Sequence, residues 1–203
     1  MGEDAPKPTS VTVLVFNLRP PEVPTFGALL LLWPLYLRVT GRRPREMRNL
    51  LIAALFHDFD HPGHAHRGVE DPDRINIDIA ISGLRRYIMP GDRPCLPEIE
   101  ALIEATHYPY KIGSDALDLL GNIVRDADLA QALSPVWIQQ VVIGLAEEQG
   151  VKPLEVLTAQ VSFLAAVRFN TEWARQLFPP EFVQAKIEEA KQLLRLLQSE
   201  PSS

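Results

Sequence analysis

The helical spacing of apolar residues constrains the fold of this chain more than any other feature of its sequence. The pattern starts near Ala28 and continues to about Gln198, with proline and glycine where one helix ends and the next begins. After Pro44, for example, apolar residues recur at spacings of three and four, as they do on the buried face of an α-helix. We therefore expect an all-α fold, with a single helical bundle over residues 28–198.

The two ends of the chain lack this pattern. Residues 1–27 contain five prolines and one short strand-like run, residues 11–16, so we expect an irregular N-terminal segment. Residues 199–203 are predicted to form a disordered tail. The abrupt change near Ala28 leaves open that residues 1–27 are not the native N-terminus, because of a wrong start or reading frame.

Composition narrows the classes of function. The 26 acidic and 20 basic residues give this chain of 203 residues a net charge of −6, which argues against nucleic-acid binding. Cys95 is the only cysteine, so an internal disulfide and a cysteine-rich zinc site are excluded. The apolar run Ala28–Leu37 is ten residues long, whereas a membrane-spanning helix needs about 20. We therefore expect a cytoplasmic protein with no membrane span.

Histidines are concentrated in one short stretch, since four of the five lie between His57 and His66. His57 and Asp58 are adjacent at the end of an apolar helix, and imidazole beside carboxylate is a donor set that suits divalent metals. The alternative is that the pair only caps the helix, because a histidine near a C-terminus interacts well with the helix dipole. We favour metal binding, since a charged pair next to so apolar a helix is costly to desolvate without a partner. His64 and His66 lie in a Gly/Pro loop, where solvation is the simpler interpretation.

At this point the sequence resembles a known family. His57-Asp58 after an apolar helix is similar to the signature pair of the HD superfamily of metal-dependent phosphohydrolases, and the string from His57 to Gly63 resembles the corresponding motif of class I cyclic nucleotide phosphodiesterases. The resemblance covers about residues 45–135. It implies an all-α fold in which His57 and Asp58 bind a metal and His61 supports catalysis.

A second part of the resemblance lies farther along the chain. Residues 125–129, Arg-Asp-Ala-Asp-Leu, are similar to the distal Ala-Asp-Leu element of the family, which implies that Asp128 is another metal ligand. From the residues alone the choice between Asp126 and Asp128 is open, because both lie on a helix whose apolar positions nearly surround it. A solvated acidic face is the simpler interpretation of an isolated Asp-Ala-Asp. We take Asp128 as the ligand and Asp126 as the alternative.

The chain departs from the family in one respect. The family places another metal-binding histidine, and in the phosphodiesterases also the proton-donating histidine, upstream of the His-Asp pair, but no histidine occurs between Met1 and Phe56. Either His107, His64 or His66 supplies the missing nitrogen, or the protein is a degenerate member that binds a ligand without hydrolysing it. A wrong start is the third explanation.

The resulting prediction is an HD-type phosphohydrolase that acts on a small-molecule phosphate ester such as a nucleotide, through a metal-activated water. His57, Asp58 and Asp128 would hold one or two ions of Mn, Fe, Co, Zn or Mg, with Asp58 and His61 as the catalytic residues. Alternatives are a degenerate HD module that serves as a metal or nucleotide sensor or an interaction domain, and a purely structural helical domain. The helix near residues 181–198 is amphipathic enough to pack against a second copy, so an oligomer is compatible with the sequence. Three further residues are candidates for binding a substrate phosphate: Arg85, Arg86 and Lys111.

Overall fold

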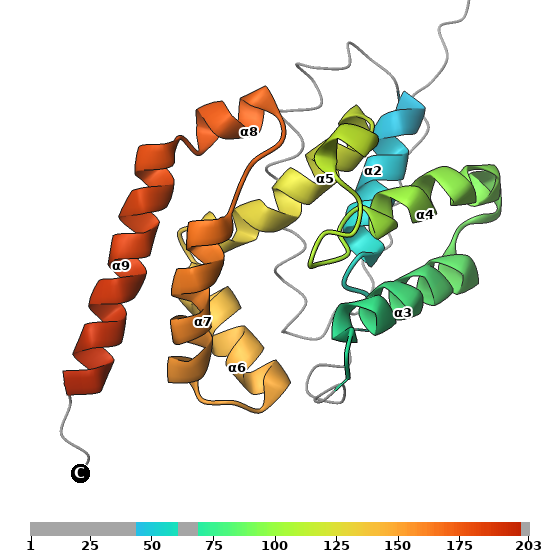
Figure 1. Cartoon of the computed structure of the whole chain (residues 1–203). Coiled ribbons are helices and arrows are strands. Elements are labelled where there is room, and N and C mark those ends of the chain that lie inside the picture. The colour runs from blue at the N-terminus through green and yellow to red at the C-terminus, as the bar shows by residue number, and fades with distance from the viewer. Residues whose placement is uncertain (1–43, 61–68, 200–203) are drawn as a thin grey trace, which may run out of the picture.

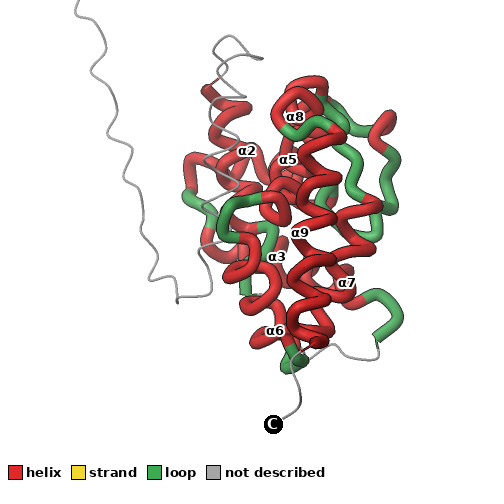
Figure 2. The backbone as a smooth tube through the Cα atoms, turned by 90° about the vertical axis from the view of Figure 1, so that its left-hand side faces the viewer, coloured by secondary structure: helices red, strands yellow, loops and turns green. Residues whose placement is uncertain are grey.

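The computed structural model describes residues 44–60 and 69–199, which form eight α-helices and no strand (Figures 1 and 2). The all-α prediction is therefore confirmed. The expectations for residues 1–27, for the start of the bundle over residues 28–43, for the tail beyond Ser199 and for His61, His64 and His66 lie outside the described residues. The helices are α2 (Pro44–Phe56), α3 (Pro72–Tyr87), α4 (Leu96–Glu104), α5 (Leu119–Ala130), α6 (Gly144–Gln149), α7 (Pro153–Ala166), α8 (Glu172–Leu177) and α9 (Pro180–Ser199).

Shorter helical segments connect these helices. Three are 3-10 turns, namely η3 (Pro90–Cys95), η4 (Ser114–Ala116) and η5 (Gln131–Leu133), and one, η6 (Ile138–Ile143), is π-helical. The last helix, α9, includes Ser199, so the helical part of the chain extends one residue beyond the boundary predicted for the tail.

Local capping chemistry accounts for several helix starts. Asp71 followed by Pro72 predicts a helix start from the sequence alone, and the structure confirms it: Asp71 caps α3 by accepting a hydrogen bond from the Arg74 backbone N–H, and Pro72 occupies the first turn. Thr171 caps α8 in the same way. From the sequence, Ser114 is predicted to cap the helix that runs through Leu117 to Leu133. This start is wrong: Ser114 begins only the η4 turn, and the cap of α5 is Asp118, whose Oδ1 accepts a hydrogen bond from the Gly121 N–H at 2.8 Å.

The buried apolar residues form two clusters, and α5 takes part in both. The first cluster joins α2, α3, α4 and the first half of α5, where Ile123 and Val124 are buried. The second joins the end of α5, from Leu129 onward, to η6, α7, α8 and α9. In Figure 1, α5 accordingly passes from the α2–α4 group to the α6–α9 group. Residues near the C-terminal end of α5 therefore lie where the two clusters meet.

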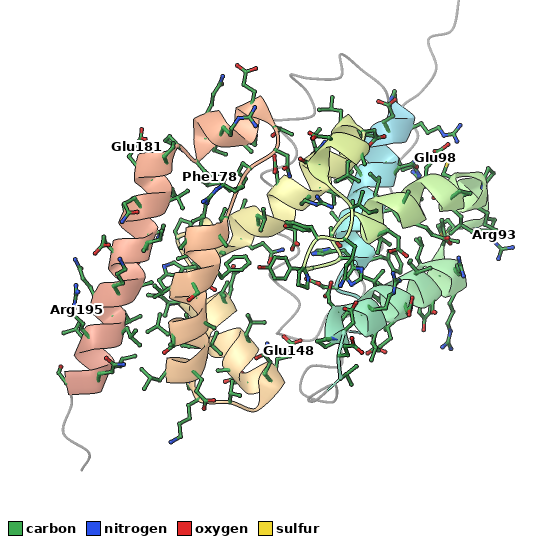
Figure 3. All side chains as sticks on the ribbon, viewed as in Figure 1. Arg93, Glu98, Glu148, Phe178, Glu181 and Arg195 are labelled. Carbon is green, nitrogen blue, oxygen red and sulfur yellow. The ribbon has the colours of Figure 1, made fainter. Side chains whose placement is uncertain are left out.

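The second cluster is closed by α9, which packs along α7. Trp137 is completely buried there, and its indole N–H donates to Glu189 on α9 at 3.1 Å. Phe178, between α8 and α9, stacks on Phe169 with ring centroids 5.1 Å apart (Figure 3). On the outer side of α9, Glu181 and Arg195 are exposed and point away from α7 (Figure 3).

The length and apolar character of a membrane span can be compared with those of the described helices. None of them alone combines the length and the apolar character needed to cross a bilayer. The stretches Leu119–Leu133 and Ile138–Gln149 meet that criterion only when taken together, and the chain bends by 94° between them.

Candidate metal centre

The His57 side chain is held by the end of α2. Its backbone N–H still bonds to the Ala53 carbonyl at 2.9 Å, although α2 ends at Phe56, and the turn that follows closes at Asp60 with a left-handed φ of 53°. The ring nitrogen Nδ1 lies 2.9 Å from the Ala54 carbonyl, to which it can only donate. This contact fixes both the orientation of the ring and the position of its proton.

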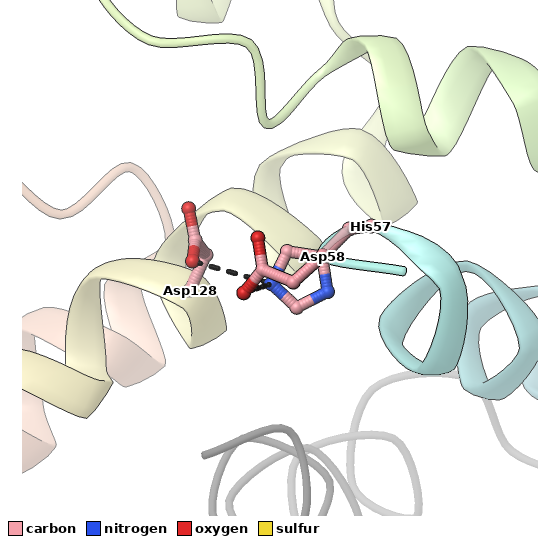
Figure 4. Close-up of side chains that lie close together, drawn as sticks. All are labelled: His57, Asp58 and Asp128. Carbon is pink, nitrogen blue, oxygen red and sulfur yellow. Dashed lines mark ion pairs between the residues drawn. The ribbon is translucent and has the colours of Figure 1, made fainter. Parts of the chain in front are cut away.

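The other ring nitrogen of His57 faces two carboxylates. Nε2 is buried without a hydrogen-bond partner, yet it lies 3.1 Å from Oδ2 of Asp58 and 3.4 Å from Oδ1 of Asp128. The three residues each present a ligating atom, and these atoms lie within 4.8 Å of one another (Figure 4). His57 and Asp58 follow α2, whereas Asp128 comes from α5, so two helices distant in sequence supply the group.

The group is buried on one side and open on the other. His57 is only 4% exposed, while the side chains of Asp128 and Asp58 are 30% and 49% exposed. The imidazole thus forms the floor of the site, and the carboxylates lie between it and solvent.

The electrostatics of the three side chains are strongly coupled. Burial opposes protonation of His57, but the negative charge of Asp58 and the contact with Asp128 outweigh it and raise the pKa of His57 well above its usual range. Burial likewise raises the pKa of Asp128, and the nearby charges of Asp58 and Asp73 add to that effect while His57 opposes it. The two carboxylates therefore favour the doubly protonated, charged form of the imidazole when no other cation is present.

These observations fit a divalent metal ion. A metal-binding histidine usually donates its second N–H to a carbonyl or carboxylate, as His57 does to Ala54. The remaining nitrogen and two carboxylates form a mixed N/O donor set that suits borderline and hard divalent ions. Capping of the helix explains only the contact of Nδ1 with the Ala54 carbonyl. It does not explain why Nε2 is buried without a hydrogen bond between two carboxylates.

Asp126 does not belong to this group. Its carboxylate accepts four hydrogen bonds, from the backbone N–H groups of Asn170 and Thr171 and from both of their side chains, at 2.7 to 3.1 Å. Burial raises the pKa of Asp126, and these hydrogen bonds oppose the rise. Asp126 therefore anchors the loop between α7 and α8, and Asp128 is the residue of the pair that faces His57.

The predicted alternatives for a further ligand or a phosphate contact lie elsewhere. His107 is buried with its Nε2 3.1 Å from Oδ1 of Asp71. The other oxygen of Asp71, Oδ2, lies 3.4 Å from Nζ of Lys111. Arg85 pairs with Glu100 at 2.7 Å on the surface. Within the described part of the chain, His107 therefore does not supply the missing nitrogen, and neither Arg85 nor Lys111 lines the cavity at the metal centre.

A cavity of about 240 Å³ opens beside these three side chains. Sequence analysis missed the residues that complete its wall, because they come from four separate parts of the chain, namely α3, the segment after α4, α5 and α7, which only the tertiary fold brings together. Asp73, in the first turn of α3, has the sequence signature of an ordinary helix-start acid. The lining residues besides the ligands are Asp73, Ile77, Thr106, Tyr108, Tyr110, Leu129 and Phe163.

Comparison with known proteins gives no relative. The chain matches no protein-family model, no curated protein and no solved structure. Its resemblance to the HD superfamily therefore stays a prediction made from the residues of the two motifs.

Proposed function

We propose that the protein is a metal-dependent phosphohydrolase that acts on a nucleotide or another small phosphate ester. The observation that carries the proposal is the convergence of His57 Nε2 with the carboxylates of Asp58 and Asp128 in the wall of a cavity. Three protein ligands that leave further positions open are typical of a catalytic rather than a structural site.

His57, Asp58 and Asp128 would hold the ion. A divalent ion in such a site supplies Lewis acidity, which activates a water and offsets the charge on phosphoryl oxygens. The chain contributes the orientation of the ligands: the Ala54 carbonyl holds the His57 ring, and α5 holds Asp128 against it. The exposed side of the carboxylates leaves room for a substrate to approach from the cavity.

Tyr110 is a candidate hydrogen-bond donor to the substrate. Its hydroxyl is buried, has no hydrogen-bond partner and belongs to a residue of the cavity wall. Burial raises the pKa of this hydroxyl, and the charge of Asp128 raises it further, so the phenol keeps its proton at neutral pH. It can therefore donate to a substrate oxygen while the ligands hold the ion. The catalytic role predicted for His61 stays part of the proposal.

A second candidate function is a metal or nucleotide sensor without turnover. The observation in its favour is that no histidine precedes Phe56, where the HD family has a further ligand and the phosphodiesterases have their proton donor. In a sensor, the same three ligands would bind the ion and the cavity would bind a nucleotide that is released unchanged.

A hydrolysis assay separates the phosphohydrolase from the sensor. The substrates are p-nitrophenyl phosphate and bis-p-nitrophenyl phosphate, with added Mn²⁺. A hydrolase should release p-nitrophenol at a rate that Asp58→Ala abolishes while the circular dichroism spectrum is unchanged. Metal uptake by the wild type without hydrolysis of either ester would favour the sensor. Activity that persists in Asp58→Ala would contradict the proposed site.

A further inference from the structure

A second, larger cavity adjoins the metal centre. Its volume is about 450 Å³, and it shares four wall residues with the cavity at the ligands. Three of these are aromatic and in mutual contact: Tyr108 meets Tyr110 and Phe163 edge-on, with ring centroids 5.4 and 5.9 Å apart. The fourth is Leu129, the residue after the ligand Asp128. A molecule of moderate size bound at the metal could therefore extend along this aromatic wall into the second cavity.

Arg125 lines the second cavity and is 2% exposed. Its Nε donates to the Ala105 carbonyl at 2.8 Å and its Nη1 to the Ile112 carbonyl at 3.0 Å. The guanidinium carbon lies 3.9 Å from the centre of the Tyr110 ring, which covers one face of the group. The side chain is thus held in one orientation by two carbonyls and an aromatic ring.

The third arm of this guanidinium has no partner among the described residues. Nη2 of Arg125 is buried and makes no hydrogen bond, and Arg125 forms no ion pair with any carboxylate among residues 44–60 and 69–199. The adjacent carboxylate of Asp126 is already engaged by Asn170 and Thr171. Burial lowers the pKa of Arg125, but a guanidinium remains charged in proteins. A buried charge with an unpaired donor is costly, so this arm is suited to an anionic ligand.

The surroundings of the cavity favour a negative group. Arg168 also lines it, and no aspartate or glutamate is among its wall residues. The rest of the wall is aromatic or aliphatic apart from Ser114 and Asn170. The cavity is therefore suited to a ligand that carries one anionic group and is otherwise apolar.

We propose that this cavity binds a second anionic group of the substrate through Nη2 of Arg125. The proposal rests on the proposed function for the phosphoryl end and narrows the substrate class: the hydrolysed ester carries a carboxylate or another phosphate besides the phosphate that reacts. The aromatic wall shared by the two cavities packs against the part of the molecule that joins the two anions.

The test compares two esters that differ only in one charge, 3-carboxyphenyl phosphate and its carboxamide analogue 3-carbamoylphenyl phosphate. Their dissociation constants are measured by calorimetry with the full chain in EDTA, because the Mn²⁺-loaded protein would hydrolyse both esters during the titration. We expect the carboxylate to bind at least about 10-fold more tightly than the carboxamide. Equal affinities would overturn the proposal.

Three variants assign the preference to Arg125. Arg125→Met should remove it, whereas Arg195→Met, which deletes the same charge from the exposed face of α9, should retain it. Because Arg125 also holds two loop carbonyls and its loss could unfold the chain, Ala166→Trp provides a second route. Ala166 is an exposed wall residue at the end of α7, so its enlargement should block the cavity and remove the preference without touching Arg125. A preference that survives in folded Arg125→Met or in Ala166→Trp would contradict the proposal.

The EDTA measurements keep this inference separate from the proposed function. A carboxylate preference that depends on Arg125, in a protein that takes up no metal, would support the anion site and overturn the phosphohydrolase. Metal uptake with hydrolysis but without a preference for the carboxylate would support the phosphohydrolase and overturn the anion site.

Discussion

Nε2 of His57 lies 3.4 Å from Oδ1 of Asp128. His57 follows α2, which belongs to the first apolar cluster, and Asp128 lies on α5, which takes part in both clusters. The approach depends on packing rather than on local sequence, because α2 and α5 are in contact and both contribute buried residues to the first apolar cluster.

Asp126 and Asp128 should respond differently to substitution. Asp126→Ala removes the acceptor of four hydrogen bonds, and each buried donor left unpaired costs about 1–3 kcal/mol. We therefore expect urea denaturation to show a loss of several kcal/mol of stability, with metal uptake by the folded fraction unchanged. If Asp126→Ala instead removed metal uptake while stability stayed constant, the assignment of the two aspartates would be reversed.

The stability of the metal-free protein should fall as pH rises above neutrality. Burial opposes protonation of His57, but Asp58 and Asp128 raise its pKa above the value of about 6.5 that it has in an unfolded chain. The folded state therefore binds more protons, and the resulting stabilisation is complete below about pH 6.5 and is lost as pH rises through the raised pKa. Burial also raises the pKa of Asp128, so the folded state binds this proton more tightly than the unfolded chain does, and stability falls in the same way as pH rises through that lower range. Urea denaturation in EDTA measures this trend, and His57→Gln should flatten it above about pH 6.5.

Metal affinity should have the opposite pH dependence. The ion competes with the proton on Nε2 of His57, so binding releases that proton and strengthens as pH rises toward the pKa of the imidazole. We expect the association constant for Mn²⁺ to rise by up to about 10-fold per pH unit in this range. Calorimetry in buffers of different ionisation enthalpy would detect the released proton, and binding without proton release would contradict the role given to Nε2.

Gly83 on α3 lies against the ring of Phe59, the residue that follows Asp58 in the turn after α2. A Cβ at this residue would clash with the Phe59 ring, which also packs on Phe56 and Tyr87. Gly→Ala in a helix interior normally stabilises by roughly 1 kcal/mol, but overpacking costs about 1–3 kcal/mol. We therefore expect Gly83→Ala to lower stability and to weaken Mn²⁺ binding, as measured by thermal unfolding and calorimetry.

Gly91 provides the matched control for Gly83. A Cβ at Gly91 meets nothing within 4 Å, so Gly91→Ala should change stability by no more than about 0.5 kcal/mol and leave metal binding unchanged. Equal effects of the two substitutions would show that Phe59 does not position the site.

Tyr110→Phe should separate stability from activity. The variant keeps the ring that covers Arg125 and removes only a buried hydroxyl without a partner, so stability should stay constant or rise. If the hydroxyl donates to the substrate, hydrolysis of p-nitrophenyl phosphate should slow by roughly 10- to 100-fold with metal uptake unchanged. Unchanged turnover would exclude Tyr110 as that donor.

Much of the fold could be predicted from local signals. Asp71 followed by Pro72 marks the start of α3, and the left-handed Gly150 ends α6, because these residues act on the backbone next to them. The start of α5 could not be predicted as reliably, since Ser114 and Asp118 are both residue types that cap helices, and only the structure shows that Asp118 accepts the capping hydrogen bond. The π-helical turn of η6 has no local signature that we recognised.

The candidate site could be predicted only where its residues form a motif. His57 and Asp58 are adjacent, and Asp128 stands in a recognisable string, so all three were identified from the sequence. Tyr110 and Phe163 come from separate elements and meet only through the tertiary fold. From the sequence, Arg125 would be expected on the surface, because a charged side chain is normally exposed. Only the structure shows that it is buried.

Metal content is the most direct test of the central claim that His57, Asp58 and Asp128 bind a divalent ion. The purified chain is incubated with Mn²⁺, Fe²⁺, Co²⁺ or Zn²⁺, desalted and analysed by inductively coupled plasma mass spectrometry beside Asp128→Asn and Asp126→Asn. We expect about one equivalent of at least one metal in the wild type and in the folded fraction of Asp126→Asn, because three protein ligands are the usual set for one catalytic ion, and a loss of that equivalent in Asp128→Asn. Less than about a tenth of an equivalent in the wild type for every ion, or the same content in Asp128→Asn, would contradict the claim.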